Sequence, residues 1–86
     1  MQVLSLGNNR IGDTGMFSLT NALGNGALAQ CTELILWDNQ IGDVGMSALA
    51  DALSKGALPQ LETVELFGNQ GNAELVRSMR LILVLG

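Results

Sequence analysis

A short alternation of apolar and polar residues occurs three times along the chain, at a constant spacing of thirty residues. The apolar positions of the three copies are Leu4 and Leu6, Leu34 and Leu36, and Val64 and Leu66. Apolar side chains at every second position predict a short strand with one buried face. Because a longer segment separates consecutive copies, we expect the chain to cross back each time and the strands to pair in parallel.

Apolar residues with helical spacing follow the first two strands and predict helices over residues 14–23 and 44–53. The inward-facing side chains are expected to be Met16, Leu19 and Leu23, and Met46, Leu49 and Leu53. Asp13 and Asp43 stand directly before the two helices. A carboxylate at that position can accept hydrogen bonds from the free amides of the first turn, so we expect both residues to be N-caps.

An asparagine follows each alternation at the same position, as Asn9, Asn39 and Asn69. A side-chain amide can both donate and accept hydrogen bonds, which suits a tight turn after a strand. Gly26 and Gly56 follow the two predicted helices, where glycine readily adopts the left-handed conformation that ends a helix. We expect both sets of residues to have structural roles.

The combined pattern, LxxLxLxxNxIGDxGxxxL, resembles the leucine-rich repeat signature L-x-x-L-x-L-x-x-N/C-x-L. It looks most like the ribonuclease-inhibitor-like subclass, which also occurs in NOD-like receptors and Ran GTPase-activating proteins. The resemblance implies an α/β fold: a leucine-rich-repeat solenoid, or horseshoe fragment, of about three 30-residue strand-helix repeats. It further implies that the asparagines form a ladder between repeats, and that the outward strand face is the concave recognition surface.

The third repeat differs from the first two. In one domain covering residues 1–86, the repeats are expected to span 1–30, 31–60 and 61–86, but residues 70–86 lose the IGDxG element. Val76, Met79 and Leu83 keep the spacing of an inward helix face, and residues 81–85 add apolar side chains that should meet solvent. Repeat arrays need terminal caps with a polar outer face. We therefore expect a fragment of a longer array.

Composition argues against several classes of function. A net charge of −4 and a pI near 4.3 disfavour nucleic acid and anionic membranes as partners. The chain has no histidine, and Cys31 occupies a core position, so we predict no catalytic residues, no metal site and no cofactor. The longest apolar run is far too short to span a membrane. A single cysteine and no signal peptide favour a cytoplasmic location.

The outward positions of the predicted strands carry aromatic and acidic side chains. Trp37 and Phe67 occupy the same position in neighbouring repeats. Exposed aromatic residues with a charged rim are typical of protein interfaces, and acidic side chains favour a partner with a basic surface. The candidate protein-binding residues are Glu33, Ile35, Trp37, Asp38, Glu62, Glu65 and Phe67.

Three other interpretations stay open. Trp37 and Phe67 could pack against each other only to stabilise the sheet. The chain could be architectural, self-associating through exposed repeat ends, as the apolar residues 81–85 suggest. GTPase activation, known in one branch of the resembling family, has only Arg10 beside a strand-to-helix loop in its favour.

Overall fold

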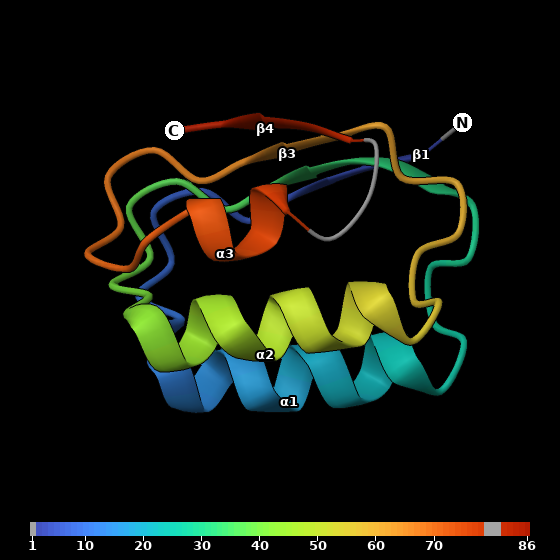
Figure 1. Cartoon of the computed structure of the whole chain (residues 1–86), viewed down its shortest axis with the longest axis horizontal. Helices are drawn as coiled ribbons and strands as arrows, with labels where there is room; N and C mark the ends of the chain where they lie inside the picture. Colours follow the sequence, from blue (N-terminus) through green and yellow to red (C-terminus); the bar gives the residue numbers. More distant parts are fainter. Residues whose placement is uncertain (1, 79–81) are drawn as a thin grey trace.

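The computed structural model describes residues 2–78 and 82–86, which form a parallel sheet with helices on one side (Figure 1). The elements in chain order are β1 (Gln2–Ser5), α1 (Gly12–Gly24), β2 (Cys31–Ile35), α2 (Asp43–Ser54), β3 (Thr63–Glu65), α3 (Glu74–Arg77) and β4 (Leu83–Leu85). The strands lie side by side in chain order, β1-β2-β3-β4. This alternation of strands and helices around a parallel sheet is an α/β repeat fold.

All described helices lie on the same side of the sheet, and the other side carries no described helix (Figure 1). We call this second side the open sheet face. The thirty-residue spacing predicts which residues pair across neighbouring strands, and the structure confirms it for Val3 with Glu33, Ser5 with Ile35, Glu33 with Thr63, and Ile35 with Glu65. Gln2 instead pairs with Cys31, because the register shifts between Gln2 and Val3.

The core lies between the sheet and the helices. Its fully buried side chains include Leu34, Leu36, Ile41, Met46, Leu49, Val64 and the predicted core residue Cys31. The predicted inward stripe of α2 is confirmed, whereas on α1 Met16 and Leu23 are buried and Leu19 is half-buried. Most of the buried apolar side chains belong to the second repeat. Because burying one leucine side chain stabilises a fold by about 2 kcal/mol, this repeat contributes most to the stability of the core.

The predicted asparagine ladder is present. Asn39 Oδ1 accepts hydrogen bonds from the backbone N–H groups of Asn9, at 2.8 Å, and Ile11, at 3.3 Å. Asn69 Oδ1 accepts the equivalent bonds from Asn39, at 2.9 Å, and Ile41, at 3.1 Å. Each of these two side-chain amides also donates to two backbone carbonyl oxygens. The ladder therefore satisfies turn backbone groups that would otherwise be buried without partners.

The prediction that Asp13 and Asp43 cap their own helices is wrong. The N-cap of α1 is Ile11 and that of α2 is Gly42, and neither makes a side-chain capping bond. Asp13 lies in the first turn of α1, and its Oδ1 accepts the backbone N–H groups of Gly42, at 2.7 Å, and Gly45, at 2.8 Å. The carboxylate therefore caps the helix of the following repeat.

The same arrangement explains why Gly45 stands inside a helix. A Cβ atom added to Gly45 would lie 2.6 Å from Asp13 Oδ1 and 2.6 Å from Ile41 Cγ2. No side chain fits there, although glycine destabilises a helix by about 1 kcal/mol relative to alanine. Asp43 also bonds to the following repeat, through the backbone N–H of Asn72 at 2.7 Å.

The expected third helix with Val76, Met79 and Leu83 on one inward face is wrong. α3 has four residues, and Leu83 lies in β4. Met79 and the first residue of the 81–85 segment lie outside the described residues. Val84 pairs with Val64, so the fourth strand follows after twenty residues instead of thirty. An aliphatic run of this length fits a short buried strand as well as a helix.

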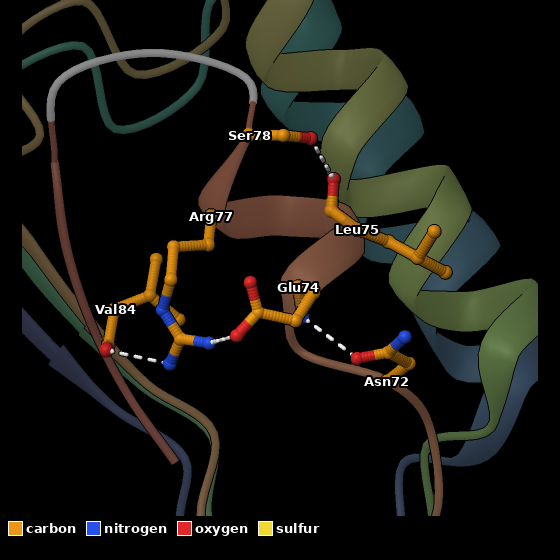
Figure 2. A network of polar contacts seen from close by, with 6 residues as sticks. All are labelled: Asn72, Glu74, Leu75, Arg77, Ser78 and Val84. Carbon is orange, nitrogen blue, oxygen red and sulfur yellow. Dashed lines mark hydrogen bonds and ion pairs between the residues drawn. The ribbon is translucent and has the colours of Figure 1, made fainter.

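Arg77 ties α3 to β4, as Figure 2 shows. Its Nη2 donates to the carbonyl oxygen of Val84 at 3.0 Å, and its Nη1 pairs with the Glu74 carboxylate. Asn72 Oδ1 accepts the backbone N–H of Glu74 at 3.0 Å and so holds the start of α3. The network fixes a short helix over the end of the sheet.

Candidate protein-binding face

The predicted binding residues come from two consecutive repeats. Trp37, Asp38, Glu62 and Phe67 are exposed, and Glu33, Ile35 and Glu65 are half-buried. Side chains of a strand alternate between the two faces of a sheet, which places Glu33, Ile35 and Glu65 opposite the buried Leu34 and Val64.

Trp37 is held in a defined orientation. Its Nε1–H donates to Glu65 Oε1 at 3.0 Å, and its side chain stays 41% exposed. On its other side the indole ring lies over Gly7, where an added Cβ would be 2.8 Å from Trp37 Cε3. The ring therefore rests on the first repeat while it bonds to the third. A side chain that is already ordered loses less conformational entropy when it binds a partner.

Glu33 and Glu65 form a carboxyl pair beside Trp37. A hydrogen bond with Glu65 raises the pKa of Glu33, and partial burial and the negative charge of Glu65 raise it further. Only a protonated carboxyl group can donate this bond, which favours the protonated form of Glu33. A lysine or arginine side chain placed against the pair would stabilise both carboxylates in their ionised forms.

Phe67 and Asp38 lie at the ends of their strands near Trp37. Phe67 is 52% exposed, and its carbonyl oxygen accepts the backbone N–H of Asp38 at 2.9 Å. The Asp38 carboxylate lies directly over Gly68, where a Cβ would be 1.8 Å from Oδ1. Gly68 also has a φ of +76°, so both its conformation and its surroundings require glycine. Packing between the Trp37 and Phe67 rings stays a prediction.

Glu62 lies at the other end of β3 from Phe67. It precedes β3, whereas Phe67 follows that strand. Five residues of extended chain span about 17 Å, so Glu62 lies at the opposite end of β3 from Phe67, next to Thr63, which pairs in register with Glu33. Ile35 is closer to the centre, because it pairs in register with Glu65.

Sequence reasoning missed the contribution of β4 to this face. Leu83 pairs with Thr63 and is 58% exposed, and Leu85 pairs with Glu65. These side chains add an apolar border beside the acidic pair. The signal that could have revealed them is the run Ile-Leu-Val-Leu over residues 82–85, which has the length and composition of a buried strand.

Few groups on the described chain suit other chemistry. Within residues 2–78 and 82–86, no three His, Cys, Asp or Glu side chains lie together as a metal site would require. Cys31 is buried, and its thiol donates to the Glu33 carbonyl oxygen at 3.3 Å. Among the helices described, none has the length and apolar character needed to cross a membrane.

Comparison with known proteins connects the repeat to a family. The family model described as Leucine Rich repeat matches residues 1–19 and residues 32–50. Each match covers a strand, its asparagine turn and the start of the following helix. No curated protein and no solved structure matches the chain. Leucine-rich repeats generally mediate interactions between proteins. Together with the parallel sheet and the asparagine ladder, the two matches support a leucine-rich repeat protein.

Proposed function

We propose that this chain is part of a ribonuclease-inhibitor-like leucine-rich-repeat solenoid whose open sheet face is concave and recognises a protein partner without catalysis. The observation that carries the proposal is the exposed Trp37 side chain, oriented by Gly7 on one side and Glu65 on the other. Tryptophan residues that are ordered before binding are common among the residues that dominate interface affinity.

The partner's chemistry follows from the charges around Trp37. Glu65 accepts the hydrogen bond from Trp37, Glu33 lies beside Glu65, Asp38 follows Trp37 in the chain, and Glu62 adds a further carboxylate before β3. The described basic residues lie elsewhere: Arg10 in a loop, Lys55 after α2, and Arg77 against β4. A partner that presents lysine or arginine around an apolar pocket would complement this face. The single buried thiol is compatible with a reducing, cytoplasmic setting.

Substitution of Trp37 tests the proposal. The folded chain would be immobilised to capture its partner, and the dissociation constant would then be measured for each variant. We expect Trp37→Ala to weaken binding by more than about 30-fold, or about 2 kcal/mol, because Trp37 fills the centre of the interface. Helix content from circular dichroism should stay unchanged.

A matched control is available on the other side of the molecule. Phe17 is an aromatic residue on α1 that is 52% exposed, so Phe17→Ala removes a comparable apolar group from the helical side. This control should leave binding unchanged. Equal losses in Trp37→Ala and Phe17→Ala would contradict recognition through the open sheet face. Loss of folding in Trp37→Ala would support a purely structural role for the ring.

A second candidate function is architectural, with self-association through the repeat ends. It is favoured by the first repeat, whose core residues Leu4, Leu6, Ile11 and Leu19 are only half-buried. Sedimentation equilibrium over a wide range of protein concentrations, with circular dichroism on the same samples, tests this candidate. Mass and helicity that rise together would support it, and a folded monomer at every concentration would count against it.

A further inference from the structure

A groove on the helical side of the molecule lies apart from the open sheet face. It runs between α1 and α2, which pack side by side (Figure 1), and has a volume of about 460 Å³. Sites for small ligands usually have volumes of about 300 to 1,000 Å³, so the groove is large enough for one. We call it the helix groove. Phe17, Asn21 and Asn25 line it on one side, and Asp51 and Lys55 line it on the other.

Small residues leave the space that the helix groove occupies. Ala48 and Ala52 of α2 are half-buried, and Gly24 is the last residue of α1. A Cβ atom added to Gly24 would have no neighbour within 4 Å, and the φ of Gly24 is not positive. Neither packing nor backbone conformation therefore requires glycine here, although glycine is a poorer helix former than alanine. The absence of a side chain at Gly24 keeps space open in the groove.

The polar side chains of the helix groove are available to a ligand. Asn21 and Asn25 are exposed, and their side-chain amides have no hydrogen-bond partner among the described residues. Each amide offers two donor hydrogens and an acceptor oxygen. Thr20 also lines the groove, but it is buried and its hydroxyl already donates to the Met16 carbonyl oxygen at 2.8 Å. The two asparagines are therefore the groups of α1 that a ligand can bond.

The charges of the helix groove balance each other. Among the described residues that line it, Asp51 and Lys55 alone are charged, and they form an ion pair at 3.0 Å. Both side chains are mostly exposed, so the carboxylate can still accept hydrogen bonds and the ammonium group can still donate them. A groove without net charge favours a neutral ligand. Its mixture of donors and acceptors favours hydroxyl groups, which both donate and accept.

Phe17 gives one end of the helix groove an apolar surface. Its side chain is 52% exposed, and Val44, which is 55% exposed, lines a neighbouring hollow together with Phe17 and Ala48. An aromatic ring beside a few hydrogen-bonding groups suits a ligand that has an apolar side and a polar edge. A sugar ring has this form, because C–H groups cover its faces and hydroxyl groups surround its edge.

We propose that the helix groove binds a neutral saccharide of one or two rings, with one ring against Phe17 and hydroxyl groups bonded to Asn21 and Asn25. Asp51 and Lys55 bond to hydroxyl groups on the opposite side. The site is separate from the open sheet face, so this inference does not rest on the proposed recognition of a protein. We expect a dissociation constant of roughly 1 mM, because the groove leaves part of the ligand in water.

An NMR titration of the full chain tests the proposal. The probes are maltose, cellobiose, lactose and N-acetylglucosamine, each added up to high millimolar concentration. We expect saturable shifts of the side-chain amide signals of Asn21 and Asn25 with at least one probe. The backbone amide of Gly68, which lies beside Asp38, should not shift. Adenosine and glycerol are the comparison compounds, because one is a planar aromatic ligand and the other is a polyol without a ring.

Two leucine substitutions on α1 make the test specific. Gly24→Leu fills open space in the groove and should weaken saccharide binding by about tenfold or more. It should preserve helix content, because its Cβ meets no other atom and leucine is the better helix former. Ala22→Leu adds the same side chain at an exposed position of α1 that does not line the groove, and it should leave the affinity unchanged. Equal losses in the two variants would overturn the proposal.

Asn21→Ala provides a second variant that does not depend on filling the groove. It removes one exposed amide and should weaken saccharide binding by about threefold or more. Unchanged affinity in Asn21→Ala would overturn the proposal, also in the case that Gly24→Leu loses helix content.

The titration itself can also contradict the proposal. The absence of saturable shifts at Asn21 and Asn25 with every saccharide would overturn it. Adenosine or glycerol that bound as tightly as the best saccharide would overturn the choice of ligand class. Partner capture through Trp37 is measured without saccharide, so the helix groove and the open sheet face are tested separately and Phe17→Ala remains a control for the latter.

Discussion

The second and third repeats begin alike and then diverge. Each has a strand followed by a ladder asparagine, and Asn39 and Asn69 each accept two backbone hydrogen bonds. The second repeat then forms the twelve-residue helix α2, whereas the third forms the four-residue helix α3. The strand and its turn thus form without the IGDxG element, whereas the repeat that lacks this element has only a short helix.

The second and third repeats also differ in their contact with the repeat before them. Gly45 has no room for a side chain because Asp13 lies against it, whereas the third repeat has Leu75 at this position. The bulk of Leu75 is incompatible with the same arrangement, and Asp43 bonds only to the Asn72 N–H among the described residues. The strands therefore follow from the sequence of their own repeats, whereas the start of α2 is also bonded to the preceding repeat through Asp13.

The largest expected difference between the two repeats concerns the ladder. Asn39→Ala leaves several part-buried backbone groups without their partner and removes a fully buried side chain, so it should reduce the free energy of unfolding by about 3 kcal/mol. Asn69 makes the same bonds but is half-buried, so water can replace part of them and Asn69→Ala should have a smaller effect. Urea unfolding of both variants measures the difference. A larger effect at Asn69 would contradict this account.

Removal of the two aspartates should give the next largest difference. Asp13→Ala removes the acceptor for two amides at the start of α2 and should cost about 1 to 2 kcal/mol of unfolding free energy. Asp43→Ala removes one exposed bond and should cost about 0.5 kcal/mol. Urea unfolding, combined with amide exchange at Gly45, distinguishes the two. If Asp13 capped its own helix instead, the Gly45 amide would exchange at the same rate in the variant.

The short third helix depends on Arg77. Arg77→Ala removes the hydrogen bond to Val84 and should cost about 1 kcal/mol, with little added by its exposed ion pair. Exchange of the Leu66 amide, which bonds to β4 at 2.7 Å, should accelerate, while the Leu36 amide should not change. Lys55→Ala, which removes an exposed ion pair on the helical side, should leave both rates unchanged.

The smallest expected effect concerns the carboxyl pair that joins the two repeats. The pKa of Glu33 is raised, so the folded state binds its proton more tightly than the unfolded state. This contribution to stability is present below the usual glutamate pKa and is lost as the pH rises through the raised value. Glu33→Gln should therefore be more stable than the unmodified chain near neutral pH, and this advantage should disappear in acid.

Urea unfolding from about pH 3 to pH 7 measures this dependence. Glu62→Gln is the control, because Glu62 is an exposed carboxylate that precedes β3. An advantage of Glu33→Gln that grew toward acid pH would have the wrong sign and would contradict the raised pKa of Glu33.

Much of the fold could be predicted because the repeat makes distant residues equivalent. Thirty-residue spacing placed Asn9, Asn39 and Asn69 in one ladder and set the register of the first three strands. The role of Asp13 could not be predicted by local capping rules, because its partners are 29 and 32 residues away. β4 was missed because a short aliphatic run fits either a helix or a strand.

The candidate site could be predicted only as a set of positions. Strand alternation brought Trp37, Glu33 and Glu65 to one face, which their spacing in the sequence already indicated. A pattern of residue types does not specify side-chain rotamers. The rotamers decide that Trp37 bonds to Glu65 and that its ring lies over Gly7.

The bonds from Asp13 to Gly42 and Gly45 also affect the order in which the chain can acquire structure. Ribosomal synthesis delivers the N-terminus first, and structure can form before the chain is complete. The carboxylate that receives the first amides of α2 is therefore already made when that helix emerges. The ladder bonds form in the opposite order, because the turn of the first repeat gains its acceptor only after Asn39 has been synthesised. The second repeat thus begins its helix against a carboxylate that is already present, and it supplies the asparagine that bonds the turn of the first repeat.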